Sequence, residues 1–196
     1  MAAKLRRICL MRGPGTLPSQ GRDRMDLSHY NVRFSGKGLL STREMVAAIP
    51  EIEAIAEIVH DDDGPNDQAT HEHLRLLARK MNGVLARPDI DGIVYVQGTN
   101  TLEETAYFLN LTVRSDKPLV VVGAQRPFTG LSTDAHLNLV NAVRVAACED
   151  ARGKGVVTVT NSEINAARDV TKTSTFQLQT FRSRDLGLLG YADPDR

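Results

Sequence analysis

Hydroxyl and amide side chains follow a strongly β-forming segment in the middle of the chain. Residues 92–96 have the sequence GIVYV, and Gln97, Thr99 and Asn100 come directly after them, before an apolar helical pattern begins. In open α/β sheets, ligands bind where a parallel strand ends and a helix begins. A threonine hydroxyl at such a point could act as a nucleophile once a base activates it. The segment therefore predicts a binding site, and its residue types indicate acyl chemistry.

A lysine that lies among hydroxyl residues is a candidate for that base. Lys172 belongs to the sequence ARDVTKTST at residues 167–175, downstream of a predicted buried strand. A lysine becomes a useful base only where burial or neighbouring charges lower its pKa. Taken alone, this segment is typical of a solvated loop. Together with a threonine at another strand end, Lys172 could take the proton from a threonine hydroxyl.

A second hydroxyl lies in a loop rich in glycine and proline, GPGTLPSQG at residues 13–21, which follows the first predicted strand. Three interpretations stay open. Thr16 could be a reactive hydroxyl held at a strand end, the loop could be a turn-rich surface segment, or the loop could bind nucleotide phosphates. The last is disfavoured because the Walker lysine pattern is missing and because Pro14 and Pro18 have no amide N–H to donate.

Three histidines flank an acidic loop at residues 61–67, and they could be taken for a metal site. They are His60, His71 and His73. Being two positions apart, His71 and His73 lie on different faces of a helix, whereas a shared ligand face needs a spacing of four. We therefore expect a solvated loop and helix start in this region, with neither a metal nor a cofactor.

The charge balance and the apolar pattern exclude several classes of partner. The chain of 196 residues has 24 Lys and Arg and 24 Asp and Glu, so no net charge draws it to nucleic acid or to a membrane surface. No apolar run reaches the roughly 18 residues of a spanning helix. The apolar stretch at residues 8–11 is too short for a signal peptide. Cys9 and Cys148 are expected to be free and buried, in a cytoplasmic protein.

Strand and helix patterns alternate along the whole chain. Strands are expected at residues 6–11, 52–59, 92–96, 118–123 and 156–160, and helices after Ser41, at residues 70–82, after Thr101 and at residues 135–148. The all-apolar segment at residues 118–123 is typical of a strand buried on both faces, as in a parallel sheet covered by helices. The pattern predicts an α/β protein with a three-layer, doubly wound, mostly parallel sheet.

Capping residues mark the expected helix starts. Ser41 with Glu44 and Thr101 with Glu104 match the capping-box pattern, and Asp134 is expected to cap the helix that follows it. The apolar residues that this last helix should turn toward the core are Leu137, Val140, Val143, Val145 and Ala146. Residues 172–196 are rich in Thr, Ser and Arg and are expected to be irregular.

Five ordered segments of the chain resemble the bacterial-type asparaginase/glutaminase family, whose members are amidohydrolases with threonine nucleophiles. The resemblance runs from about Arg7 to Tyr191. The family patterns TGGTI, HGTDT-[ML]-EET, GAxRP, NLxxAV and RDVTKT correspond here to GPGTL at residues 13–17, QGTNTLEET at residues 97–105, GAQRP at residues 123–127, NLVNAV at residues 138–143 and RDVTKT at residues 168–173.

The resemblance implies hydrolysis of asparagine, or of glutamine or a related small amide, to the acid and ammonia through a threonine acyl-enzyme. By this resemblance Thr16 is the first nucleophile, and Tyr30 is the tyrosine that helps to activate it. Thr99 is the second threonine, and Lys172 is the lysine that activates it. The substrate-binding residues that it implies are Asn66, Asp67 and Asn100, the first two from an ungapped alignment. The implied partner is a small-molecule amide.

Two substitutions depart from the family pattern inside the predicted site. Pro14 replaces a glycine of the nucleophile loop, which fixes φ near −65°. Asn100 replaces the aspartate that pairs with the α-ammonium of the substrate and lies beside the lysine. Hydrogen bonds to charged groups contribute about 1.5–3 kcal/mol, and a neutral neighbour no longer favours the charged form of Lys172. We therefore expect poor binding of α-ammonium substrates, or a preference for amides without one.

The resemblance also implies a domain organisation. Residues 1–190 correspond to the N-terminal α/β domain of the family and residues 191–196 to the start of an interdomain linker, and the C-terminal domain is expected to be absent. Full-length relatives are expected to be homo-oligomers. The alternative to an active enzyme is a truncated, catalytically weak or inactive domain, with a binding role or none. A dinucleotide-binding module is disfavoured because no GxGxxG motif opens a helix.

Overall fold

Strands and helices alternate as predicted up to β5 (Val156–Thr160), whereas the predicted alternation is wrong beyond it, because only strands follow in the part of the chain that the structure describes. The computed structural model describes residues 4–30, 35–63 and 70–193. The strands are β1 (Arg6–Arg12), β2 (Ala56–Asp61), β3 (Gly92–Val96), β4 (Leu119–Val122), β5 (Val156–Thr160), β6 (Glu163–Ala166), β7 (Val170–Lys172), β8 (Phe181–Ser183) and β9 (Gly190–Tyr191). The α-helices are α2 (Thr42–Ala47), α3 (His71–Leu85), α4 (Leu102–Thr112) and α5 (Ala135–Ala147), and 3-10 turns lie at η1 (Pro50–Ala54) and η2 (Glu149–Ala151).

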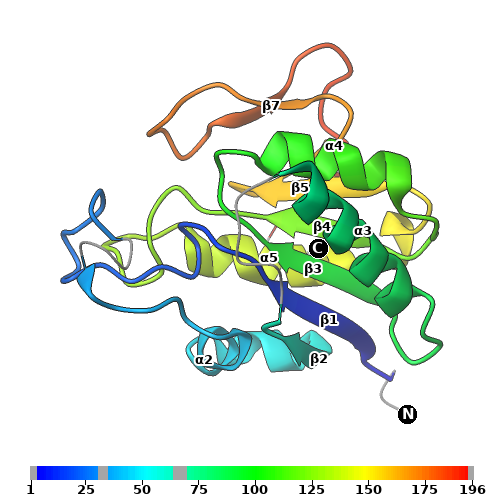
Figure 1. Cartoon of the computed structure of the whole chain (residues 1–196), viewed down its shortest axis with the longest axis horizontal. Coiled ribbons are helices and arrows are strands. Elements are labelled where there is room, and N and C mark those ends of the chain that lie inside the picture. The colour runs from blue at the N-terminus through cyan, green and yellow to red at the C-terminus, as the bar shows by residue number, and fades with distance from the viewer. Residues whose placement is uncertain (1–3, 31–34, 64–69, 194–196) are drawn as a thin grey trace.

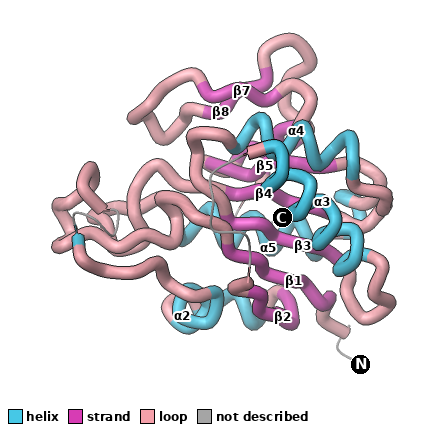
Figure 2. Tube along the Cα trace, in the orientation of Figure 1, coloured by secondary structure: helices cyan, strands magenta, loops and turns pink. Residues whose placement is uncertain are grey.

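A mostly parallel sheet forms the centre of the molecule (Figure 1). Among the described residues, seven strands pair in the order β2-β1-β3-β4-β5-β6-β9, and β7 and β8 form a separate two-stranded sheet. Neighbouring strands from β2 to β5 are parallel, whereas β6 and β9 are antiparallel additions at one edge. Helices flank the sheet on both faces (Figure 2). The predicted α/β fold class is confirmed.

Side chains of the central strands alternate between two apolar cores. In β1, Ile8 and Leu10 belong to the core shared with α2, η1 and α5, whereas Cys9 and Met11 belong to the core shared with α3 and α4. Every residue of β3 and of β4 is buried. Burial on both faces is what a parallel sheet between two helical layers requires. The uninterrupted apolar runs in the sequence therefore reflect the three-layer arrangement.

The loops that follow β1 and β3 are in direct backbone contact at the carboxyl edge of the sheet. The Gly98 N–H donates to the Pro14 carbonyl at 2.8 Å. A Cβ atom at Gly15 would lie 2.2 Å from the Gly98 nitrogen, so no side chain fits at that position. This contact holds the loop that carries Thr16 against the loop that carries Thr99.

The expected strand at residues 52–59 begins later than predicted. Residues Pro50–Ala54 form the 3-10 turn η1, and β2 starts only at Ala56. Pro50 lies at the first position of η1, where its fixed φ suits a helical start. A helical turn that is led by proline therefore replaces the first part of the predicted strand.

One of the two predicted capping boxes is confirmed and the other is wrong. The Ser41 side chain accepts the Glu44 N–H while the Glu44 carboxylate accepts the Ser41 N–H, at the start of α2. Thr101 is the N-cap of α4 but makes no side-chain cap. Its Oγ1 instead accepts a hydrogen bond of 3.2 Å from Gln97 Nε2. The predicted reciprocal contact with Glu104 is therefore absent, since the Thr101 hydroxyl is engaged by the amide of the preceding loop.

The start of α5 differs from the prediction in two respects. Asp134 occupies the N-cap but caps no helix N–H, because its carboxylate accepts the backbone N–H groups of Gln125 and Arg126 at 2.9 and 3.0 Å. Leu137 was expected to face the core and is 53% exposed. Asn138 is buried in the core-facing position beside it, where its amide donates to the Gly123 carbonyl at 3.0 Å. Polar contacts with the β4–α5 loop thus set the rotation of this helix.

Residues 172–196 contain more regular structure than predicted. β7 and β8 pair antiparallel, with Val170 opposite Ser183 and Lys172 opposite Phe181. Val170 and Phe181 are buried against the α3–α4 side of the sheet. Each strand is three residues long, which is too short for an alternating pattern to stand out in the sequence. We call residues 170–183 the β7–β8 hairpin.

The two cysteines are free, and they differ in burial. Cys9 is buried in β1 as predicted, whereas Cys148 is exposed and not buried as expected, because it lies just beyond the end of α5. Burial raises the pKa of the Cys9 thiol to about 11. None of the described helices has both the length and the apolar character needed to cross a membrane.

Candidate active site

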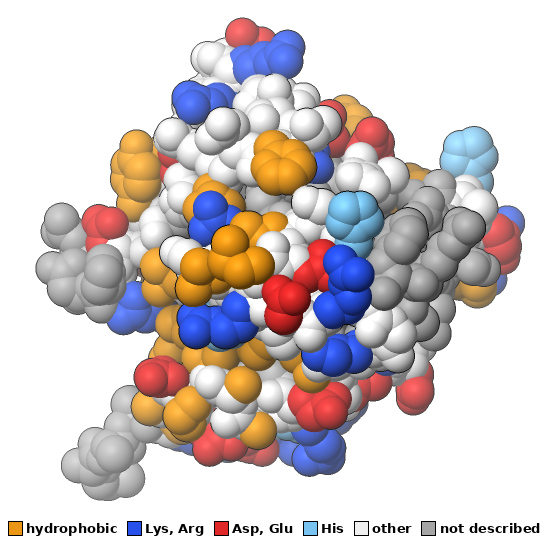
Figure 3. All heavy atoms as spheres, turned by 90° about the vertical axis from the view of Figure 1, so that its left-hand side faces the viewer, with side chains coloured by type: hydrophobic (Ala, Val, Ile, Leu, Met, Phe, Trp, Pro, Cys, Tyr) orange, Lys and Arg blue, Asp and Glu red, His pale blue; other side chains and the backbone are white. Residues whose placement is uncertain are grey.

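A pocket of about 500 Å³ opens at the carboxyl edge of the sheet. Figure 3 views the molecule from this side, where hydrophobic, basic and acidic side chains are interspersed. Thr16, Tyr30, Thr99 and Lys172, the four predicted catalytic residues, all line this pocket. The other described residues that line it are Pro14, Gly15, Ser19, Leu27, Ser28, Leu39, His73, Tyr95, Gln97, Gly98, Asn100, Thr101, Gln125, Thr175 and Phe176.

Thr16 is buried in the loop after β1 and is paired with a tyrosine. Its Oγ1 lies 2.9 Å from the Tyr30 hydroxyl oxygen. The backbone of this loop is fixed by Ser19, whose N–H donates to the Thr16 carbonyl at 3.0 Å and whose Oγ donates to the Gly15 carbonyl at 2.7 Å. Pro14 lies in the same loop, where its carbonyl accepts the Gly98 N–H at 2.8 Å. The structure therefore brings the predicted hydroxyl pair together.

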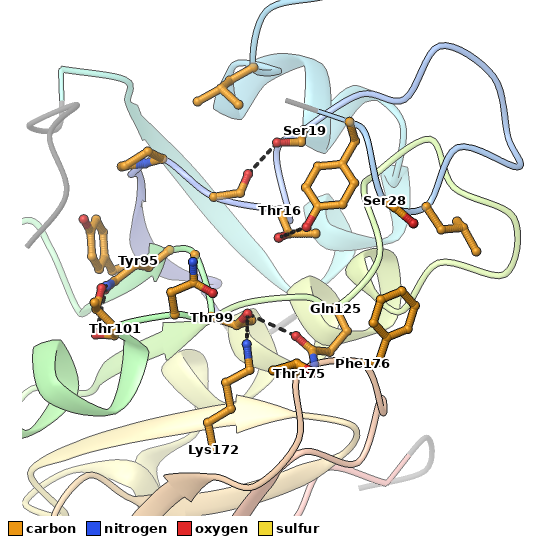
Figure 4. Close-up of a pocket in the computed structure, with 18 of the residues that line it drawn as sticks. Thr16, Ser19, Ser28, Tyr95, Thr99, Thr101, Gln125, Lys172, Thr175 and Phe176 are labelled. Atoms are coloured by element: carbon orange, nitrogen blue, oxygen red, sulfur yellow. Dashed lines mark hydrogen bonds between the residues drawn. The ribbon is translucent and has the colours of Figure 1, made fainter. Parts of the chain in front are cut away.

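Thr99 lies at the carboxyl end of β3 between a lysine and an amide (Figure 4). Its Oγ1 accepts a hydrogen bond of 2.7 Å from Lys172 Nζ and donates one of 3.0 Å to Gln125 Oε1. Gln125 Nε2 donates to the Gln177 carbonyl at 3.2 Å. Because only the NH₂ of the amide can donate to a carbonyl, the Gln125 oxygen must face Thr99. The hydroxyl proton of Thr99 is therefore directed to Gln125, and the lysine is the donor in its contact with Thr99.

Lys172 is partly buried, and its environment changes its protonation. Burial lowers the pKa of the Lys172 ammonium, and the nearby Glu103 carboxylate opposes this in part. Burial has this effect because desolvation penalises the charged form of an amine. The Glu103 carboxylate accepts the backbone N–H of Lys172 and, at 3.1 Å, the Thr171 hydroxyl. A lysine whose pKa is lowered reaches the free-amine form nearer to neutral pH, as a base requires.

The predicted substrate-binding residues are only partly placed. Asn100 lines the pocket and its side chain is exposed. Asn66 and Asp67 lie outside the described residues. No Asp or Glu is among the described lining residues, and Lys172 is the only Lys or Arg there. The part of the pocket that the structure describes therefore offers no carboxylate to a cationic substrate.

Gln125 and Glu103 were missed as site residues when the sequence was considered alone. Gln125 follows β4, so the rule that singled out Thr99 at the end of β3 applies to it equally. No comparable signal marks Glu103, because the capping-box pattern directs attention to the neighbouring Glu104. The contact of Glu103 with Lys172 joins residues 69 positions apart in the chain, which no local pattern reports.

Gln97 and Tyr95, at the end of β3, are buried polar residues of the same pocket. Gln97 Nε2 donates to Thr105 Oγ1 at 2.8 Å and to the Thr101 carbonyl at 3.2 Å. Its Oε1 and the Tyr95 hydroxyl are buried and have no hydrogen-bond partner among the described residues. Burial raises the pKa of Tyr95 to about 12. Gln97 therefore links the end of β3 to the first turns of α4.

His71 and His73 lie on different faces of α3, as their spacing predicts. His71 is exposed, whereas His73 is buried and lines the pocket. The burial of His73 differs from the solvated helix start that we expected. Within the described ranges, no group of three His, Cys, Asp or Glu side chains could hold a metal ion.

Fold and site together define a class of protein. This is a three-layer α/β protein with two buried hydroxyl groups in one pocket, one paired with a tyrosine and the other with a lysine of lowered pKa. The family model "Asparaginase, N-terminal" matches residues 7–196. The chain therefore belongs to the asparaginase family, and the resemblance seen in its sequence is confirmed.

Individual relatives agree with this family. L-asparaginase 2 of Bacillus subtilis (strain 168) is 40% identical over 185 residues, which cover 93% of this chain and 48% of that protein. The glutaminase-asparaginase of Pseudomonas fluorescens biotype A is 38% identical over 182 residues, 92% of this chain and 49% of that protein. The crystal structure of a probable cytoplasmic L-asparaginase from Campylobacter jejuni superimposes with a TM-score of 0.90 at 36% identity, covering 97% of this chain and 57% of that one. The chain spans about half the length of the curated relatives that it matches.

Proposed function

We propose that this chain carries the hydrolytic site of an asparaginase, which converts asparagine, glutamine or a related small amide to the acid and ammonia. The observation that carries the proposal is the contact of 2.7 Å between Lys172 Nζ and Thr99 Oγ1, in the pocket that also contains the Thr16–Tyr30 pair. A hydroxyl is a weak nucleophile unless a neighbouring group takes its proton. Both hydroxyls have such a neighbour here.

In the proposed reaction, Thr16 Oγ1 attacks the side-chain amide carbon of the substrate. The hydroxyl proton passes by way of the Tyr30 oxygen to the leaving nitrogen, the C–N bond breaks, and ammonia departs. Water then adds to the threonine ester, and cleavage of the ester bond restores the Thr16 hydroxyl and frees the acid. In the second step Lys172, as a free amine, takes the proton of Thr99 after that hydroxyl turns away from Gln125, and the Thr99 oxygen takes a proton from the attacking water. When the ester bond breaks, the Thr16 oxygen takes up the proton held by Lys172, so all groups return to their starting state.

We also propose that the site favours amides without an α-ammonium group. Asn100 is neutral, and no Asp or Glu is among the described lining residues. An ammonium group that leaves water for this pocket gains no charged partner from them, although charged hydrogen bonds contribute about 1.5–3 kcal/mol each. Asn66 and Asp67, which lie outside the described residues, remain proposed contacts of the substrate.

The domain boundary and the location of the protein are also proposals. We infer that residues 1–190 correspond to the N-terminal domain of an asparaginase, supported by the family model that matches residues 7–196. A cytoplasmic location has support from the name of the Campylobacter jejuni relative, whereas a relative of Haemophilus influenzae is named as a probable periplasmic L-asparaginase. A homo-oligomer is proposed only for full-length proteins of this family.

Ammonia release from the purified chain tests the proposed function, with asparagine and glutamine as substrates. Thr16→Ala and Thr99→Ala should each lower kcat by at least about a hundredfold, since the first removes the nucleophile and the second removes the hydroxyl that activates water. Thr112→Ala is the matched control, because the Thr112 hydroxyl only donates to the Phe108 carbonyl within α4. Circular dichroism should show the same folded spectrum for all variants. A folded chain that releases no ammonia would instead identify a catalytically inactive domain.

A further inference from the structure

The β7–β8 hairpin carries Lys172 but lies outside the main sheet. It lies over α4 (Figure 1), and its two strands pair only with each other among the described residues. Thr99, by contrast, belongs to the loop between β3 and α4. The distance between Lys172 Nζ and Thr99 Oγ1 therefore depends on what holds the hairpin against α4.

We propose that Glu103 is a positioning residue, which holds the backbone of Lys172 on the first turn of α4 and so places the amine on Thr99. The inference rests on the proposed function, which gives Lys172 its task. Glu103 is the second residue of α4 and follows Thr99 by four positions. Its carboxylate oxygens accept the Lys172 N–H and the Thr171 hydroxyl, one oxygen to each donor. One strand-to-helix junction thus supplies both the hydroxyl and the group that locates its base.

The remaining contacts of the hairpin are made by other residues. Val170 at the start of β7 and Phe181, which lies opposite Lys172 in β8, are buried in the apolar core. Ser183 Oγ donates to Asn165 Oδ1 at 2.8 Å, and the turn is held through the bond from Gln125 to the Gln177 carbonyl. Among the described residues, Glu103 is the group that binds the backbone at Lys172 itself. Its loss should therefore release the backbone of Lys172 while Val170 and Phe181 stay packed.

Glu103 acts on Lys172 through its charge as well as through its position. The carboxylate favours the ammonium form and so opposes the lowering of the Lys172 pKa by burial. The other titratable side chains that line the pocket with Lys172 are Tyr30, His73 and Tyr95, and no Asp or Glu is among the described ones. Position and charge can be separated, because glutamine has nearly the same shape as glutamate and retains one oxygen acceptor.

The test compares Glu103→Gln and Glu103→Ala with Glu104→Gln, the same change at the adjacent exposed glutamate. The Lys172 amine is titrated by NMR of its ε-carbon, and hydrogen exchange is measured at the Lys172 backbone amide. In Glu103→Gln, the titration midpoint of Lys172 should move to lower pH. In Glu103→Ala, the midpoint should also change, and exchange at the amide should become at least about tenfold faster. Glu104→Gln should change neither quantity.

The inference is overturned if both Glu103 variants match Glu104→Gln in the Lys172 titration and in amide exchange. Neither measurement requires turnover. Altered titration and exchange in a chain that releases no ammonia would therefore support the role of Glu103 and contradict the proposed function. Unchanged ammonia release in Glu103→Ala, together with an unchanged titration of Lys172, would contradict the role of Glu103 and support the proposed function. Glu103→Gln replaces one oxygen by nitrogen, so it reports on the charge even where Glu103→Ala fails to fold.

Discussion

At the scale of single residues, the hydrogen-bond directions around Thr99 define the resting state of the site. Gln125 is oriented by the Gln177 carbonyl, so its oxygen accepts the Thr99 proton while Lys172 donates to the same hydroxyl. In this arrangement the lysine is not acting as a base. It can do so only after it loses a proton and the Thr99 hydroxyl rotates away from Gln125. The lowered pKa of Lys172 makes the first of these changes easier.

Asn100→Asp tests the proposed substrate preference. A carboxylate at this exposed pocket position should pair with an α-ammonium group, which is worth about 1.5–3 kcal/mol and so about a ten- to hundredfold change in affinity. We expect the KM for asparagine to fall by about this factor, measured by ammonia release. Asn100→Ala, which adds no charge, should not lower it. If the KM for asparagine is the same in Asn100→Asp as in the original chain, the proposed preference for amides without an α-ammonium group is contradicted.

The four catalytic candidates and their pairing, Thr16 with Tyr30 and Thr99 with Lys172, could be predicted through the family resemblance, but their contacts with Gln125 and Glu103 could not. Thr16, Tyr30, Thr99 and Lys172 were identified from the sequence and line one pocket. The contact of Lys172 with Glu103 depends on how the hairpin lies on α4, which no local pattern encodes. A capping box is predicted from residue spacing alone. The spacing does not show that the Thr101 hydroxyl already accepts a hydrogen bond from the Gln97 amide.

At the scale of elements, the loops after β1 and β3 are less tolerant of change than the helices. Gly15→Ala would place a methyl group 2.2 Å from the Gly98 nitrogen, which forces the two loops apart. We expect the ammonia-releasing activity to fall at least about tenfold and the free energy of unfolding to fall by about 1–3 kcal/mol. Urea denaturation and the ammonia assay measure the two effects.

Gly83→Ala is the matched control for Gly15→Ala. Gly83 is exposed inside α3, and a Cβ there meets nothing within 4 Å. Alanine at such a helical position should stabilise the fold by about 0.5–1 kcal/mol and leave activity unchanged. Equal behaviour of the two variants would contradict the claim that the loop contact, rather than glycine itself, is essential at Gly15.

The elements that the sequence predicted best are those whose burial is uniform. β3 and β5 have the bounds that were expected, because every residue in them is buried and apolar or β-branched. The β7–β8 hairpin was not predicted, since its pairing joins short polar segments. In α5 the apolar period predicts the burial of Val143, Val145 and Ala146 correctly. In its first turn, polar contacts of Asn138 and Asp134 determine which side chains face the core.

At the scale of the whole molecule, the partly buried lysine carries a stability cost that depends on pH. The pKa of Lys172 is lower in the folded state than its ordinary value of 10.5. Below the folded pKa, Lys172 is charged in both states, and the folded state bears the full desolvation penalty. Through the window from the lowered pKa to 10.5, the unfolded state binds more protons, so stability rises with pH. Above this pH window, Lys172 is neutral in both states and the desolvation penalty is absent.

Lys172→Met should therefore abolish activity without destabilising the fold. We expect the Tm at about pH 7 to stay equal or to rise by up to about 3 °C, and the difference from the original chain to shrink as the pH approaches 10.5. Lys154→Met, at an exposed position, should leave the Tm unchanged at both pH values. Thermal unfolding followed by circular dichroism at the two pH values checks this. A Tm that falls by several degrees near neutral pH would show that the contact with Thr99 outweighs the desolvation penalty.

The two hydroxyl pairs of the site differ in how far apart their residues lie in the sequence, and they therefore become available at different times during synthesis. Thr16 and Tyr30 are 14 positions apart, whereas Thr99 and Lys172 are 73 apart. Closing the longer loop costs about 1.5 kcal/mol more conformational entropy. During synthesis, both residues of the first pair are present while the chain is still short, but Thr99 lacks its contact with Lys172 until the hairpin has left the ribosome. A growing chain therefore contains both residues of the first pair long before it contains both residues of the second.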